Sequence, residues 1–93
     1  MSEKNIKVYV LSHYYDTPDV EGNDILGVYS LLEDAQNVME SEATAIQKEF
    51  PDDFWDEDMT WAEEFEIHLG HNPKAAYKSA TIYCWTIQEM EVQ

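Results

Sequence analysis

The chain has 93 residues, of which 20 are aspartate or glutamate and five are lysine, and its formal net charge is −15. This length suffices for a single domain, residues 1–93, and excludes a multidomain enzyme, while the negative charge excludes direct binding to nucleic acid or to an anionic membrane. Hydrophobic residues make up 44% of the chain and aromatic residues 13%, which is more apolar content than an unfolded polyanion carries, so we expect a small acidic globular domain.

An alternating, β-prone run at residues 6–14 predicts the first strand. Its apolar residues fall on both faces, with Ile6, Val8 and Val10 on one face and Tyr9 and Leu11 on the other. Apolar residues on both faces are typical of a central strand rather than an edge strand. A turn-rich segment, residues 16–24, separates this run from a second β-prone run at residues 25–29, so we predict an antiparallel hairpin with a long loop.

A helix is predicted over about residues 31–49. Ser30 and Glu33 have the spacing of a capping box, in which each side chain bonds to a backbone N–H near the other residue. Apolar residues then follow at spacings of three and four, which places them on one helical face: Leu32, Ala35, Met39, Ala43, Ile46 and Phe50. This face is expected to pack on the sheet. Pro51 disfavours helical geometry in the residue before it and therefore marks the end of the helix.

The second half of the chain predicts two further strands. Residues 51–61 have no clear period and are interpreted as a loop with one helical turn. Apolar residues at 65, 67 and 69 alternate with polar ones, which fits a strand with one solvated face. A turn at residues 70–73 precedes another alternating run at residues 79–92. The predicted fold class is α+β, a small antiparallel sheet in the order β-β-α-β-β with one amphipathic helix packed on one face.

Three of these segments also resemble a known pattern. They are Lys7-Val8-Tyr9-Val10-Leu11-Ser12-His13-Tyr14, Ile25-Leu26-Gly27-Val28-Tyr29-Ser30 leading into a helix with Glu33 and Ala35, and Trp85-Thr86-Ile87-Gln88-Glu89-Met90-Glu91-Val92. In these segments the chain resembles a family of small uncharacterised bacterial and phage β-α domains, which pair a "KVYVLSH" strand with a "GVYS" strand. The resemblance covers about half of the chain. It implies a fold but no activity, and relative to it residues 51–78 are an acidic and aromatic insertion.

The strongest functional signal is a run of acidic residues within this segment. Eight carboxylates fall within residues 52–66 with no basic residue among them: Asp52, Asp53, Asp56, Glu57, Asp58, Glu63, Glu64 and Glu66. As a helix this stretch would span about 22 Å, a length over which duplex DNA carries about 13 charges. From Val8 to Pro73 there are seventeen acidic residues and one lysine, so the charges are not arranged as local ion pairs.

Large aromatic residues are interleaved with these acids, namely Phe54, Trp55 and Trp61. Aromatic side chains in a loop are typical of interface anchors. We therefore predict that the eight carboxylates and these three aromatic residues form a partner-binding site. Two alternatives stay open: the acids keep a solvated loop soluble, and one or two of the aromatic residues pack into the core.

The sequence predicts no metal ligand, cofactor site or catalytic residue. His13, His68 and His71 lack cysteine partners and a His-Glu-x-x-His helix. Ser12 and His13 are neighbours on a strand and point to opposite faces, so they cannot pair as nucleophile and base. Cys84 lies on an apolar strand, where an inert thiol is expected. One cysteine and an N-terminus without an apolar signal region predict a cytoplasmic protein.

These observations predict a non-enzymatic binding protein. Its partner is expected to be a basic protein, a nucleic-acid-binding enzyme in the concrete version, whose binding groove the acidic site would occupy as a DNA or RNA mimic. By composition this is similar to phage inhibitors of the anti-CRISPR or anti-restriction type. One alternative is an immunity or antitoxin protein that neutralises a basic toxin nuclease. Another is a housekeeping domain whose sheet binds a small ligand or a second copy of the chain as a homodimer.

Overall fold

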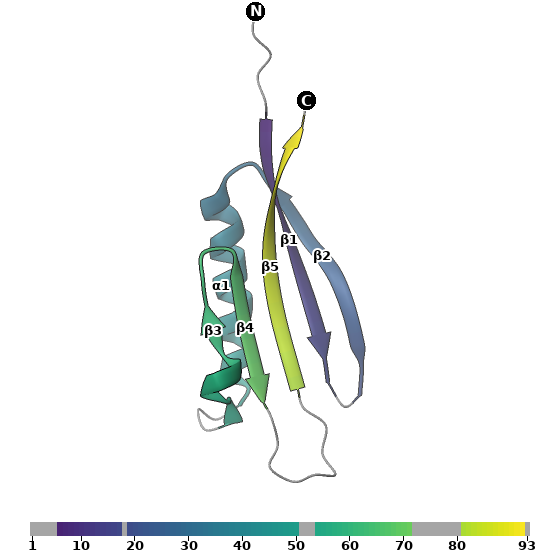
Figure 1. The fold of residues 1–93 in the computed structure, drawn as a ribbon, viewed down its shortest axis with the longest axis vertical. Coiled ribbons are helices and arrows are strands. Elements are labelled where there is room, and N and C mark those ends of the chain that lie inside the picture. Colours follow the sequence, from purple (N-terminus) through teal and green to yellow (C-terminus); the bar gives the residue numbers. More distant parts are fainter. Residues whose placement is uncertain (1–5, 18, 51–53, 72–80, 93) are drawn as a thin grey trace, which may run out of the picture.

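The sheet is built around the pairing of the two ends of the chain (Figure 1). The computed structural model describes residues 6–17, 19–50, 54–71 and 81–92. The elements in chain order are β1 (Ile6–Asp16), β2 (Glu21–Tyr29), α1 (Leu32–Lys48), the 3-10 turn η2 (Glu57–Met59), β3 (Trp61–Ala62), β4 (Glu66–His71) and β5 (Thr81–Val92). The five strands are antiparallel neighbours in the order β2-β1-β5-β4-β3. The predicted α+β class is confirmed, and the short strand β3 is added to the four predicted strands.

The hairpin of β1 and β2 differs from the prediction, because both strands continue through the polar residues expected to form a long loop. The Tyr14 hydroxyl donates to Glu21 Oε2 at 2.9 Å, and the Tyr15 hydroxyl donates to Asp24 Oδ2 at 3.3 Å. These bonds join the two strands across the hairpin. The connection itself is short, and in it the Thr17 N–H donates to Val20 O at 2.8 Å. The long loop predicted over residues 16–24 is therefore wrong.

Helix α1 begins one residue later than the capping box requires. Leu31 is the N-cap residue, with extended backbone angles and no side-chain hydrogen bond to the helix. Since Ser30 lies one position before the cap, its hydroxyl does not cap the helix, and the predicted capping box is wrong. Glu33 and Asp34 lie in the first turn, where negative charge interacts favourably with the positive end of the helix dipole.

The core lies between α1 and one face of the sheet. Its buried hydrophobic side chains come from β1, α1, β4 and β5: Leu11, Ala35, Met39, Ala43, Ile67, Leu69, Trp85 and Ile87. The helical residues among them belong to the predicted apolar face, which is confirmed. Ala35 and Ala43 are small, so the helix approaches the sheet closely. The predicted strand around Ile67 and Leu69 is confirmed as β4.

The other face of the sheet is covered by no described element over β2, β1 and β5. We call this surface the open face and define it by apolar side chains that cross-strand pairing places together: Ile6, Val8, Val10, Ile25, Val28, Met90 and Val92. Five of the seven are classed as large exposed hydrophobic residues: Ile6, Ile25, Val28, Met90 and Val92. The prediction that β1 is a central strand is confirmed, since it lies between β2 and β5. In this structure, however, α1 covers only one of its two apolar faces.

Two leucine-to-alanine substitutions test where the stability of the domain resides. Leu11 is 0% exposed and Leu31 is 60% exposed. We expect Leu11→Ala to lower the free energy of unfolding by about 2–5 kcal/mol, because it leaves a cavity beneath α1. Leu31→Ala removes the same atoms from a side chain that is exposed to solvent. It should therefore change the free energy of unfolding by less than about 0.5 kcal/mol. Urea denaturation measures both values, and equal losses would contradict the placement of the core.

Candidate functional site

The structure describes six of the eight predicted acidic residues, and Asp52 and Asp53 lie outside the described residues. Asp56 precedes η2, which contains Glu57 and Asp58. Glu63 and Glu64 form the connection from β3 to β4, and Glu66 is the first residue of β4. Glu57, Asp58, Glu63 and Glu64 are exposed, whereas Asp56 and Glu66 are half-buried. The four exposed carboxylates are free to face a partner.

The two half-buried carboxylates have partners within the domain. Asp56 Oδ1 accepts the N–H of Asp58 at 2.9 Å and so caps η2. Glu66 Oε2 accepts the indole N–H of Trp61 at 2.7 Å. Asp56 thereby supports η2 and the site. Glu66 and Trp61 lie on the side of the sheet away from α1, because Ile67 and Leu69 are the residues of β4 that face the helix.

The three predicted aromatic anchors differ in how much of each ring is exposed to a partner. Phe54 stacks on Phe50 and on His71, with ring centroids 4.4 Å and 3.7 Å apart. Trp55 is half-buried against the core and meets Phe50 edge-on. Trp61 is 39% exposed and stacks on His68 at 4.2 Å. Phe54 and Trp55 therefore pack into the domain, which was one of the two alternatives left open by the sequence.

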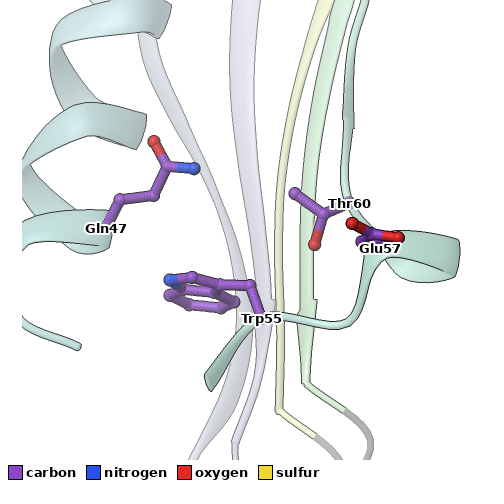
Figure 2. A pocket seen from close by; sticks show the side chains of 4 residues that line it. All are labelled: Gln47, Trp55, Glu57 and Thr60. Atoms are coloured by element: carbon purple, nitrogen blue, oxygen red, sulfur yellow. The ribbon is translucent and has the colours of Figure 1, made fainter. Parts of the chain in front are cut away.

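A cleft separates α1 from the η2–β3 segment. Two adjoining cavities of about 390 Å³ and 320 Å³ make up this α1–β3 cleft, and they share Gln47 and Thr60 as lining residues. The first is also lined by Trp55 and Glu57. Figure 2 shows the Trp55 indole at its base, between Gln47 on the helix side and Glu57 and Thr60 on the other side. The second cavity is lined in addition by Glu40, Ala43, Thr44, Trp61, Ala62, Ile67 and Leu69.

Two acidic residues, Glu40 and Glu57, line the cleft, and others lie on the elements that border it. Glu33, Glu40 and Gln47 follow one another at seven-residue spacing, which keeps them on the same flank of α1. Gln36, on the same flank, donates from Nε2 to Glu64 O at 3.0 Å and joins the helix to the β3–β4 connection. We define the acidic rim as the six exposed carboxylates on this side: Glu33, Glu40, Glu57, Asp58, Glu63 and Glu64.

The rim carboxylates are not neutralised within the described part of the chain. The salt bridge found among the described residues joins Lys7 Nζ to Glu89 Oε2 at 3.6 Å, and it contains no residue of the rim. The floor of the cleft is aromatic and apolar. A negative rim above an aromatic floor suits a cationic side chain, because the ring face and the carboxylates both attract positive charge.

The η2 segment is held against β4 by close backbone contacts. The Asp56 N–H donates to Gly70 O at 2.8 Å, and Thr60 Oγ1 accepts the Gly70 N–H at 3.2 Å. A Cβ atom on Gly70 would lie 2.5 Å from Met59 Cβ and 2.8 Å from Met59 O. Only glycine therefore allows η2 to approach β4 this closely, and the rim residues on η2 are positioned by that approach.

The histidines have structural partners. His68 Nδ1 donates to Met59 O at 2.6 Å, His13 Nδ1 donates to Cys84 O at 3.1 Å, and His71 Nδ1 donates to Phe54 O. A carbonyl oxygen can only accept, so Nδ1 carries the proton in each case. Within residues 6–17, 19–50, 54–71 and 81–92, no group of three or more histidine, cysteine or carboxylate side chains could hold a metal ion.

Sequence reasoning missed three of the residues that line the cleft, two on α1 and one next to β3. Glu40, Gln47 and Thr60 line it, and none belonged to the predicted site. The seven-residue spacing of the helical residues, beside the apolar stripe, is the signal that could have found them. Thr60 carries no such signal, because its place depends on the pairing of β3 with β4.

Comparisons with protein-family models, with curated proteins and with solved structures found no match. The helix in the described part of the chain is not long and apolar enough to cross a membrane. The site is therefore interpreted from its own geometry.

A pair of glycine substitutions tests the anchoring of η2. We expect Gly70→Ala to lower the free energy of unfolding by about 1–3 kcal/mol, because the new Cβ meets the Met59 backbone. Gly27→Ala is the matched control in β2, since its Cβ would meet the movable end of the Tyr29 side chain at 2.7 Å. Urea denaturation followed by tryptophan fluorescence measures both, and a Gly70→Ala protein as stable as the Gly27→Ala protein would contradict the close approach.

The Cys84 thiol provides a prediction about reactivity. Burial raises the pKa of Cys84 above its ordinary value, and the charge of Glu66 raises it further, while the hydrogen bond between Cys84 and Thr86 lowers it. Since the thiolate is the reactive form, iodoacetamide should alkylate the folded protein more slowly than the urea-unfolded chain at about pH 8. Mass spectrometry over time measures both rates. Faster alkylation of the folded protein would show an activated cysteine instead.

Proposed function

We propose that this protein is a non-enzymatic binding protein whose acidic rim docks on a basic, nucleic-acid-binding site of a partner protein and blocks it. The observation that carries the proposal is the acidic rim itself: six exposed carboxylates, outside the salt bridge found among the described residues, on the elements that border one cleft, with Glu40 and Glu57 lining it. Exposed charges of one sign destabilise a compact domain through repulsion. Their concentration beside a cleft is therefore better explained by a partner than by folding.

The charge density of the rim is comparable to that of a nucleic-acid strand. From Glu33 to Gln47 the helix rises about 21 Å. Over that length one strand of a duplex carries about six phosphates, and the rim offers six carboxylates. A site that binds phosphates with lysine and arginine side chains can therefore meet a similar number of negative groups on this surface.

The cleft adds a shape-specific part to this electrostatic attraction. Trp55 forms its base. Trp61 also lines the second cavity, while its indole stacks on His68 on the side of the sheet away from α1. An arginine or lysine side chain of the partner that enters the cleft would contact the indole ring of Trp55 together with the carboxylates of Glu40 and Glu57. The rim would then speed association, while the desolvated contacts in the cleft would slow dissociation.

A non-enzymatic role is supported by the chemistry of the nucleophiles and bases near the site. The raised pKa of the Cys84 thiol disfavours its reactive form. His13 and Ser12 are adjacent residues of β1, so their side chains leave opposite faces of the sheet. Each histidine ring is stacked on an aromatic neighbour and bonded to a backbone carbonyl, which fits a packing role.

Two variants with the same net charge separate the rim from charge in general. The rim variant carries Glu40→Gln, Glu57→Gln and Asp58→Asn, and the control variant carries Glu42→Gln, Glu91→Gln and Asp19→Asn. All six residues are exposed, and each variant loses three negative charges. The assay measures release of a fluorescent duplex DNA from a short arginine-rich peptide by fluorescence anisotropy, as each protein competes for the peptide.

The wild-type protein should release the DNA at low salt, and the effect should fade as salt screens the charges. At about 0.5 kcal/mol per exposed contact, the rim variant should lose about tenfold in apparent affinity for the peptide. The control variant should stay within about twofold of the wild type. Equal losses in the two variants would show that net charge alone matters, and no competition by the wild type at low salt would refute the proposed function.

A further inference from the structure

The open face leaves the most apolar strand of the sheet half covered. In β1, Tyr9 and Leu11 face α1, and Leu11 is fully buried. Val8 and Val10 point the other way, where no described element covers them. Cross-strand pairing adds Val28 opposite Val10 and Met90 opposite Val8. Val28 is 60% exposed and Ile25 is 70% exposed, so the open face presents exposed apolar side chains on all three strands.

The middle of this surface carries no charged side chain among the described residues. The positions that separate the apolar residues there are neutral, Ser12 and Gln88 among them. The nearest carboxylates on the same side lie at its margins, with Asp16 and Glu21 at the hairpin end and Glu66 on β4. In a chain with a net charge of −15, the open face is set apart from the acidic rim, which lies on the helix side.

We propose that the open face is the interface of a symmetric homodimer, in which two copies stack their sheets face to face. The charge distribution favours a second copy over a basic partner, because a basic protein gains no electrostatic energy on a neutral surface and is drawn to the rim instead. In the stacked dimer both α1 helices lie on the outside. With layers about 10 Å apart, the two helices are about 30 Å from each other, nearly four Debye lengths in physiological salt.

The size of the open face agrees with a dimer interface. Three strands about 4.8 Å apart and about ten residues long cover roughly 500 Å². The apolar side chains occupy the half nearer the two ends of the chain, and polar residues such as Ser12 and Asn23 occupy the other half as a rim. Two such surfaces together reach about 1,000 Å², near the lower limit for a specific protein interface. Burial of apolar area at about 25 cal/mol per Å² is the main source of stability in such a contact.

A two-fold axis near Val10 would satisfy the geometry of the contact. In a two-fold dimer the same patch serves both copies, so a self-complementary surface is required. Rows of valine and isoleucine side chains on a twisted sheet interdigitate with an identical row when the strands are aligned within about 30°. Val28 lies opposite Val10 on β2, and Met90 lies opposite Val8 on β5. Both side chains would contribute to the buried centre of the contact.

The dimer is independent of the proposed function, because the acidic rim remains on the outer layer of each copy. The two contacts should also respond to salt in opposite directions. Salt screens the repulsion between two acidic copies, so it should strengthen the dimer, whereas it should weaken binding of a basic partner at the rim.

Sedimentation of two valine variants tests the dimer. The wild-type protein should sediment at about twice the 10.9 kDa mass of the chain and should dissociate on dilution. Val28→Glu places one carboxylate from each copy in the interface, so it should weaken association at least about a hundredfold. Val20→Glu is the matched control, since Val20 is 53% exposed in the turn between β1 and β2 and should leave the dimer unchanged.

Circular dichroism of each variant establishes that the monomer is folded, and Ile25→Glu is a second variant on the same face. A wild-type protein that is monomeric throughout the dilution series would overturn the proposal. A dimer that survives Val28→Glu and Ile25→Glu as well as it survives Val20→Glu would also overturn it, and would direct attention to the edge of β2. Neither result bears on competition at the rim.

Discussion

The antiparallel pairing of β1 with β5 is the constraint on which the rest of the structure depends. It joins the two ends of the chain, from Ile6 opposite Val92 to Asp16 opposite Ile82. Strand β2 attaches to β1, and β4 attaches to β5. Since side chains alternate along a strand, the register also decides which residues meet α1. A shift by one residue would expose Trp85, which is now fully buried. Pairing β1 with β5 closes a loop that contains most of the chain, and the entropic cost of this closure precedes the favourable contacts between the two strands.

This register divides the molecule into two surfaces of different chemistry. Helix α1 uses its apolar stripe to cover one side of the sheet, so its acidic flank must face outward beside η2 and the β3–β4 connection. The opposite side of the sheet remains apolar and neutral in its middle. Acidic charge and exposed apolar area are therefore kept apart. The proposed partner contact and the proposed dimer contact occupy different sides of the domain for this reason.

The sequence predicted most elements because their signals are local. The spacing from Leu32 to Ile46 identified α1 and its buried face, and the alternation at Ile67 and Leu69 identified β4. The single helical turn expected in residues 51–61 is present as η2. The local signals for the hairpin loop and for the helix cap failed, because contacts with neighbouring segments outweigh them. Tyr14 and Tyr15 bind acids across the hairpin and turn an expected loop into strand. Leu31 takes the cap position that the Ser30 pattern had predicted.

By itself, the sequence determined the α+β class, the amphipathic helix, the central place of β1 and the concentration of acidic residues in the middle of the chain. These follow from periodicity and composition, which each segment carries alone. Only the tertiary structure decided which acids and aromatic residues come together. Phe54 is taken up by stacking on His71, Asp56 by the cap of η2, and Glu40 and Gln47 enter the cleft from a different element. Such assignments depend on contacts between segments distant in sequence, and no local pattern encodes those distances.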